Sequence, residues 1–386
     1  MSTPYSFQGA VWVPYLSLVL LALAVKPFPY RALFFLPIPP LTAYVLRSTT
    51  GNFNTDYVLG LMWLLLFWFA SDYILLTDVQ RTLRRVPPNR TAAPQKVIEN
   101  ASLWHRTRWA VVLLDSPRGV GWTHESTVLP AHPAAGTSRA AFIVQRLWKA
   151  LQLFIIHDAS KLHQRWNPMF TSNRPGRRAE GWMWRAIVVT GWCLSSYSTV
   201  SLMATVLSVF NVACGLSKPE EWPPFFGSPA DAYTIRRLWG RAWHQLMRRF
   251  VSTHGKYLAH RVLGLSPGSN TSAYVQLYTA FAISALIHHG AETMALRHWR
   301  GGALAFFMLR PCAIMLEDCL IFLGRRAGIK GGFALRLVGY AWVWAWFTLT
   351  LPIWQEPLMR GGHMDESLPV SIILGLWRGE WVLRSW

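Results

Sequence analysis

The chain has 386 residues, of which 52% are hydrophobic and only 15% are charged. In a soluble globular protein about a quarter of all residues are charged, so this composition excludes an ordinary soluble fold. The 38 Lys and Arg residues outnumber the 18 Asp and Glu residues and give a formal net charge of +20. Together with long apolar runs and 22 Trp, this charge indicates an integral membrane protein. Its basic residues are expected in cytosolic loops and its Trp rings at the level of the lipid headgroups. We expect no nucleic-acid partner.

Apolar segments recur along the whole chain, and a membrane-spanning helix needs about 20 mostly apolar residues. The segments that reach or approach this length are residues 7–25, 32–46, 57–76, 186–217, 262–291, 301–323, 337–355 and 367–377. We therefore predict an all-α, polytopic membrane protein with about seven to nine transmembrane helices. Residues 1–386 show no internal repeat and are expected to form a single domain.

Three segments have individual features. Prolines 37, 39 and 40 should break or kink the segment 32–46. Residues 186–217 carry no charge and form either one long tilted helix or a helix plus a re-entrant piece. Residues 140–156 are amphipathic and are expected to lie in the interface instead of spanning.

The basic residues gather in long loops between the apolar segments. These loops are residues 81–108, 139–185 and 236–261. By the positive-inside rule, we expect all three to face the cytosol.

The four cysteines lie in or beside apolar stretches and include no C-x-x-C pair. We expect them to be buried hydrophobic side chains, with neither a disulfide framework nor a zinc site. A metal site at the adjacent His288 and His289 is not expected either, because neighbouring helical side chains point about 100° apart.

Three carboxylates, those of Asp72, Glu317 and Asp318, lie in apolar surroundings. A charge in such surroundings is costly unless it is paired, and it marks a function by default. Structural ion pairs with arginines such as Arg310 are the interpretation that we favour here.

The first candidate site lies in a run rich in Trp and Arg. Residues 222–227 read W-P-P-F-F-G, and residues 236–249 carry several arginines. On one continuous helix, a single face would hold Arg237, Arg241, His244 and Arg248. This face either rests on lipid headgroups or binds a phosphorylated cosubstrate, since guanidinium groups bind phosphate in a bidentate manner.

The second candidate site is the histidine pair within residues 281–292. An ionisable side chain inside a long apolar helix is a functional candidate. Ser284 lies one turn before His288, and Glu292 lies one turn after it. The Glu292 carboxylate could hold the imidazole tautomer, as the third member of a catalytic triad does. Alternatively, both histidines only bond to backbone near the membrane interface.

These two stretches resemble the wax-synthase-like branch of the membrane-bound O-acyltransferase superfamily. More narrowly, they are similar to the fungal O-acetyltransferases of terpenoid and meroterpenoid biosynthesis. The runs that carry the resemblance are W-P-P-F-F-G at 222–227, R-R-L-W-G-R-A-W-H-Q at 236–245 and S-A-L-I-H-H at 284–289, with R-G-V-G-W at 118–122 and S-D-Y at 71–73 as further features. The resemblance is strong over residues 222–300 and elsewhere concerns mainly hydropathy.

The resemblance implies acyl transfer from an acyl-CoA to a hydroxyl group inside a tunnel in the membrane. It implies that His288 is the catalytic base, and it maps His244 onto the polar residue that follows the second Trp of the upstream run. Glu292 is a further catalytic candidate on its spacing from His288 alone. The chain departs from the usual pattern at Ala285, where Gly is common, and at His289, where Glu often follows the base. The second departure leaves two candidates for the base, of which we favour His288.

Acetyl-CoA is the expected cosubstrate, bound through the phosphates by Arg237, Arg241 and Arg248, and no permanent cofactor is expected. The acceptor is expected to be a hydrophobic alcohol that enters from the bilayer of the endoplasmic reticulum. An alternative enzyme of this type makes wax or sterol esters from long-chain acyl-CoA. Two alternatives of another class are a polytopic transporter, which often carries a duplicated half, and a membrane scaffold.

Overall fold

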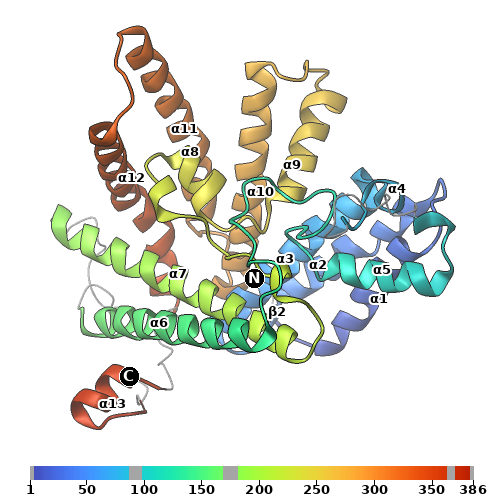
Figure 1. Cartoon of the computed structure of the whole chain (residues 1–386), viewed down its shortest axis with the longest axis horizontal. Coiled ribbons are helices and arrows are strands. Elements are labelled where there is room, and N and C mark those ends of the chain that lie inside the picture. Colours follow the sequence, from blue (N-terminus) through green and yellow to red (C-terminus); the bar gives the residue numbers. More distant parts are fainter. Residues whose placement is uncertain (1–3, 87–97, 168–180, 363–369, 383–386) are drawn as a thin grey trace. The chain divides into compact units, whose positions relative to one another are not determined.

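The computed structural model describes residues 4–86, 98–167, 181–362 and 370–382. Within these ranges the chain is mostly helical, as predicted, and the strands are the short parallel pair β1 (Tyr5–Ser6) and β2 (Ser48–Thr49) (Figure 1). Parts of the predicted cytosolic loops (87–97 and 168–180) and of the last apolar segment (367–369) lie outside the described residues.

The chain divides into two compact units, and each is described by itself. The first unit combines Met1–Thr127 with Gln245–Cys312, and the second combines Val128–His244 with Ala313–Trp386. The single domain expected for residues 1–386 stays a prediction.

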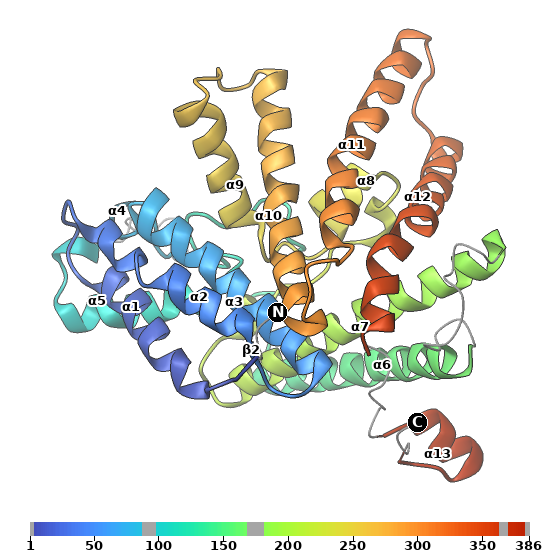
Figure 2. The same cartoon turned by 180° about the vertical axis from the view of Figure 1, so that it is seen from behind.

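Both chain segments of the first unit contribute helices and short helical turns (Figure 2). In chain order they are η1 (Gly9–Val11), α1 (Trp12–Ala24), η2 (Arg31–Phe35), α2 (Ile38–Arg47), α3 (Phe53–Ser71), the π-turn η3 (Asp72–Leu76), α4 (Val79–Thr82), η4 (Ile98–Asn100), α5 (Leu103–Leu114), α9 (Arg248–Lys256), the π-turn η10 (Tyr257–Val262), α10 (Asn270–Leu296) and the first part of α11 (Ala303–Arg326).

The second unit holds two long antiparallel helices, several short turns and the C-terminal helices. In chain order its elements are α6 (Arg139–Trp166), α7 (Trp182–Ala213), η7 (Pro219–Glu221), η8 (Pro229–Asp231), α8 (Ile235–Arg237), the π-turn η9 (Leu238–Ala242), the second part of α11, α12 (Phe333–Arg360) and α13 (Ile372–Arg378). Helix α7 is one continuous helix, so the arrangement with a re-entrant piece is wrong.

The prolines of the second apolar segment break it, as predicted. The segment divides into η2 and α2, and Pro39 and Pro40 lie in the first turn of α2. Proline is tolerated in a first helical turn because the amide hydrogen that it lacks has no partner within the helix there.

Three helical stretches of the described residues are long and apolar enough to cross a membrane. They are Phe53–Leu76, Trp182–Ala213 and Phe333–Arg360, and Gly9–Ala24 is a shorter apolar stretch. These stretches bear out a membrane protein, whereas the count of seven to nine spanning helices stays a prediction.

Helices α3 and α10 approach each other closely in the first unit. A Cβ atom added at Gly60 of α3 would lie only 2.9 Å from Cα of Ala291 on α10. Small residues at such a crossing let two helix backbones come together. The contact places the start of α3 beside the segment of α10 that carries the histidine pair, and so it positions the candidate site.

Candidate active site

His288 projects from α10 into an aromatic setting within the first unit. Its imidazole stacks on the Phe307 ring, with centroids 4.4 Å apart and planes inclined by 10°. At the edge of the ring, Nδ1 lies within hydrogen-bond distance, 3.3 Å, of Oη of the buried Tyr57 on α3. The ring is therefore held by an aromatic face from α11 and a phenol from α3.

Glu292 has partners other than those that we expected. Its buried carboxylate accepts hydrogen bonds from the backbone amides of Gly302 (3.2 Å) and Ala303 (3.0 Å) at the start of α11. The nearest imidazole in an ion-pair geometry is that of His289, at 3.6 Å. The amides that begin a helix have no partners within the helix and attract negative charge. The expected contact with His288 is therefore wrong, and Glu292 fixes the start of the helix that carries Phe307.

Ser284 also acts locally. Its hydroxyl donates to the carbonyl oxygen of Ala280, one turn earlier in α10, at 3.0 Å. This back-bond is common for serine inside a helix.

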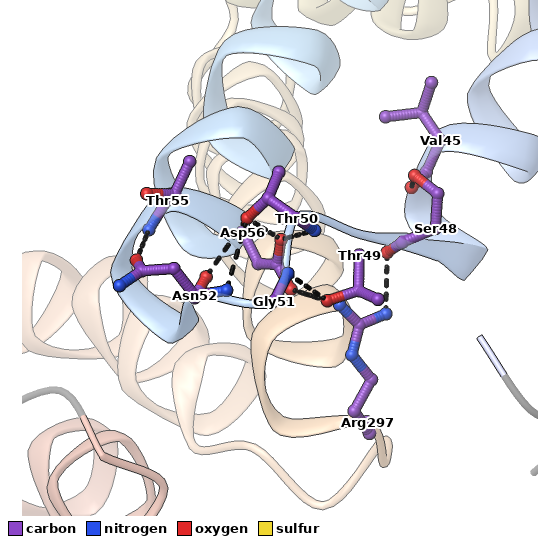
Figure 3. Close-up of polar contacts among 9 residues, drawn as sticks. All are labelled: Val45, Ser48, Thr49, Thr50, Gly51, Asn52, Thr55, Asp56 and Arg297. Atoms are coloured by element: carbon purple, nitrogen blue, oxygen red, sulfur yellow. Dashed lines mark hydrogen bonds and ion pairs between the residues drawn. The ribbon is translucent and has the colours of Figure 1, made fainter. Parts of the chain in front are cut away.

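A second set of contacts fixes the end of α10 against the start of α3 (Figure 3). The Asp56 carboxylate accepts hydrogen bonds from the Thr49 hydroxyl and from the amide and hydroxyl of Thr50, each at 2.7 Å. It also pairs with Arg297, whose guanidinium donates to the carbonyl oxygen of Ser48 at 2.7 Å. We call this set the Asp56–Arg297 latch.

Arg297 stands at a backbone position that side chains other than glycine rarely adopt. It is the residue that ends α10, and it has a left-handed φ of 60°. Left-handed backbone costs an L-residue about 1–2 kcal/mol. The ion pair of Arg297 with Asp56 and its hydrogen bond to the carbonyl oxygen of Ser48 offset this cost.

The single arginine face expected over residues 237–248 is wrong, because no continuous helix runs through it. The π-turn η9 ends at Ala242, Trp243 is extended (φ −73°, ψ 160°), and α9 begins only at Arg248. The amide of Gly227 donates to the carbonyl oxygen of Ala242 at 2.9 Å. This contact takes an acceptor that a continuing helix would need, and the W-P-P-F-F-G loop thereby ends the helix.

His244 lies in an aromatic cluster of the second unit. Its ring centroid is 5.7 Å from that of Phe225, 5.9 Å from that of Phe226 and 5.5 Å from that of Trp243. Gly227 permits this packing, because a Cβ atom there would lie 2.1 Å from the carbonyl oxygen of Arg241. The two matching sequence runs therefore fold against each other around His244.

The three arginines proposed from the sequence differ in their surroundings. In the second unit, Arg237 pairs with Asp231 and stacks over the Tyr233 ring, while Arg241 is exposed. In the first unit, Arg248 donates to Oε1 of Gln245 at 2.9 Å. Part of the Arg237 charge is thus neutralised within its own loop.

The predicted ion pairs are confirmed for Asp72 and Asp318, with arginines other than Arg310, whereas Glu317 accepts hydrogen bonds from neutral groups. Asp72 pairs with Arg249 at 3.0 Å, and Asp318 pairs with Arg236. Arg310 is fully buried, with its guanidinium 3.8 Å from the centroid of the Phe306 ring.

Glu317 accepts three hydrogen bonds within the second unit. The donors are the amides of Ile235 (2.6 Å) and Arg236 (3.1 Å) and the indole of Trp342 (2.9 Å). These bonds anchor the start of the second matching run to α11 and α12.

All four cysteines lie in the described residues and are free thiols. The expectation of burial is wrong, because Cys214, Cys312 and Cys319 are exposed and Cys193 is only partly buried. Among the residues that the structure describes, no group of three His, Cys, Asp or Glu side chains could hold a metal ion.

Tyr57 and Phe307 are two contacts of His288 that sequence reasoning missed. Tyr57 precedes His288 by 231 residues, and neither Tyr57 nor Phe307 lies in the short sequence runs that carry the resemblance. No local spacing signals such partners, because they meet His288 only through the packing of α3 and α11 on α10.

Comparison with known proteins identifies relatives along most of the chain. Residues 222–309 match the membrane bound O-acyl transferase family. Acetyltransferase ple2 of Rhodocybe pseudopiperita is 38% identical over 366 residues, which cover 94% of each chain. Acetyltransferase eriL of Hericium erinaceus is 35% identical over 360 residues, 92% of each chain.

A third relative is acetyltransferase ataH of Aspergillus terreus, which is 31% identical over 288 residues, 68% of this chain and 93% of its own. No solved structure matches the chain. The identity to ple2 and eriL extends over both units, well beyond the segment matched by the family. The chain therefore belongs to the membrane-bound O-acyltransferase family and is an enzyme that transfers acyl groups to oxygen.

Proposed function

We propose that the protein transfers the acetyl group of acetyl-CoA to a hydroxyl group of a terpenoid or meroterpenoid intermediate. The relatives named acetyltransferases support the acyl group. The observation that carries the chemistry is the position of His288 inside the matched segment. Its half-buried imidazole stacks on Phe307 and lies within hydrogen-bond distance of Tyr57. The acceptor is a hydrophobic alcohol that enters from the bilayer. We assign the enzyme to the membrane of the endoplasmic reticulum.

The reaction requires one base and no covalent acyl-enzyme. Nε2 of His288 takes the proton of the acceptor hydroxyl as its oxygen attacks the thioester carbonyl. The tetrahedral intermediate then collapses: the carbon–sulfur bond breaks, and the CoA thiolate takes the proton back from the imidazolium. The products are the acetate ester and CoA, and His288 returns to its neutral form.

We assign His244 to the oxyanion that forms in this step. An imidazole N–H directed at the developing charge lowers the barrier in a water-poor environment. Its aromatic neighbours Phe225, Phe226 and Trp243 support this role, because they keep the imidazole in a fixed orientation.

For Glu292 we propose a supporting role in place of the direct one expected from the sequence. Its bonds to Gly302 and Ala303 fix the start of α11, four residues before the Phe307 ring that stacks on His288. It is a positioning residue because it acts through another side chain.

The acetyl-CoA phosphates are assigned to the arginines, with Arg241 and Arg248 ahead of Arg237. The Arg241 side chain is exposed to solvent, whereas Arg237 pairs with Asp231. Guanidinium groups suit phosphate because they donate two parallel hydrogen bonds.

The decisive experiment compares His288→Ala with His289→Ala in microsomes supplied with acetyl-CoA and a terpenoid alcohol. Loss of a general base lowers kcat by about 100-fold or more. We expect this loss for His288→Ala and a much smaller one for His289→Ala, at equal protein abundance. Undiminished turnover by His288→Ala would remove His288 as the base.

The same microsomes distinguish the acyl group. Acetyl-CoA should be consumed far faster than palmitoyl-CoA with the same alcohol. The reverse preference would make the enzyme a wax or sterol ester synthase.

A further inference from the structure

The start of α3 provides the polar contact that holds the His288 ring by its edge. Tyr57 is only 9% exposed, and its Oη lies 3.3 Å from Nδ1 of His288. The contact joins two helices that pack tightly, because Gly60 of α3 approaches Ala291 of α10 within the same crossing. The phenol is therefore presented to the imidazole by rigid elements.

The Asp56–Arg297 latch fixes the same turn of α3. Asp56 directly precedes Tyr57, and its pairing with Arg297 ties that turn to the end of α10 (Figure 3). Tyr57 is thus held in place on α3, and His288 is held in place on α10. A hydroxyl held in this way has little freedom to leave Nδ1.

Phe307 removes the remaining freedom of the imidazole. The nearly parallel stack, with planes 10° apart, fixes the plane of the ring. A contact at Nδ1 then fixes its rotation within that plane. Together, the two contacts determine the direction in which Nε2 points.

We propose that Tyr57 is the positioning residue that sets the tautomer of His288. Its Oη accepts the hydrogen of Nδ1–H, so the lone pair of the neutral ring stays on Nε2, where the acceptor hydroxyl delivers its proton. The same bond stabilises the imidazolium that forms during the reaction. This role, which rests on His288 acting as the base, is the one that sequence spacing had assigned to Glu292.

Tyr57→Phe tests this role, because it removes the hydroxyl and keeps the ring. We expect kcat to fall about tenfold, in line with the loss of one hydrogen bond in a buried site, while KM for acetyl-CoA and for the alcohol stays unchanged. Tyr15→Phe is the matched control, because Tyr15 is a fully buried tyrosine of the same unit on α1. It should leave kcat unchanged.

Abundance in microsomes and the midpoint of thermal unfolding in detergent separate positioning from folding. Both should stay at the wild-type value in Tyr57→Phe. A folded Tyr57→Phe enzyme with wild-type kcat would overturn the proposal, and so would a rise in KM with kcat unchanged.

A double variant separates this proposal from the assignment of the base. The residual turnover of His288→Ala, followed with radiolabelled acetyl-CoA, should not fall further when Tyr57→Phe is added. An equal additional loss would show that Tyr57 acts independently of His288, against the proposal. Wild-type turnover in His288→Ala alone would instead overturn the proposed base.

Discussion

Glu292 and Gly301 share one small volume at the junction of α10 and α11. A Cβ atom added at Gly301 would lie 2.1 Å from Oε2 of Glu292, the same oxygen that accepts the amide of Ala303. Glycine at 301 therefore leaves the room that the carboxylate needs in order to fix the start of α11. The stack of Phe307 on His288 depends on this arrangement, because α11 carries Phe307.

Gly301→Ala should displace the carboxylate and destabilise the protein. Overpacking at a filled position costs about 1–3 kcal/mol, which thermal unfolding in detergent detects as a lower midpoint. The control is Gly331→Ala, where an added Cβ meets nothing within 4 Å. Equal midpoints for the two variants would contradict the shared volume.

The Asp56–Arg297 latch makes a backbone prediction. Arg297→Ala and Arg297→Gly remove the same guanidinium, but only Gly adopts the left-handed φ without strain. We expect Arg297→Gly to be about 1 kcal/mol more stable than Arg297→Ala, in the range known for left-handed backbone. Chemical denaturation of both variants measures the difference, and a more stable Arg297→Ala would refute it.

If Arg241 and Arg248 bind the phosphates of acetyl-CoA, replacing either one should weaken the binding only of acyl donors that carry these phosphates. Arg241→Gln and Arg248→Gln should raise KM for acetyl-CoA about tenfold, since one charge-assisted hydrogen bond is lost in each. With S-acetyl-pantetheine, which lacks the nucleotide phosphates, both variants should match the wild type. Arg236→Gln, whose side chain pairs with Asp318, serves as the control with unchanged KM. A uniform loss with both donors would reject the assignment.

His124 makes the stability of the first unit depend on pH. Burial lowers the pKa of His124 to about 3, with a smaller contribution from the charge of Arg249. The unfolded chain takes up the proton near the ordinary histidine pKa of about 6.5. Between these values the unfolded state binds more protons, so stability is complete above about pH 6.5 and falls as the pH drops toward 3.

His124→Phe should flatten this dependence. Thermal unfolding between pH 7 and pH 5 measures the slope for the variant and the wild type. The control is His105→Phe at an exposed position of α5, which should keep the wild-type slope. An unchanged slope in His124→Phe would show that other groups carry the dependence.

The long apolar helices could be predicted from the sequence because hydropathy is a local property. The spans predicted at 57–76, 186–217 and 337–355 correspond to α3 with η3, to α7 and to α12. The placement of His288 and Glu292 on one helix was also predicted, because their spacing of four residues is again local.

The partners of these side chains could not be predicted in the same way. Glu292 bonds to the start of α11 and Tyr57 reaches His288 from α3, and both contacts depend on tertiary packing. The arginine face over 237–248 was wrong because a helical projection assumes that the helix continues. The backbone contact from Gly227 to Ala242, which comes from a different loop, ends it.

The close approach of Gly60 to Ala291 has a consequence for engineering the enzyme. Any side chain at position 60 would push α3 away from α10 and so separate Tyr57 from His288. A library of variants intended to admit bulkier alcohols should therefore leave residues 57, 60 and 291 unchanged. Variation is better placed on segments that do not determine the spacing of these two helices.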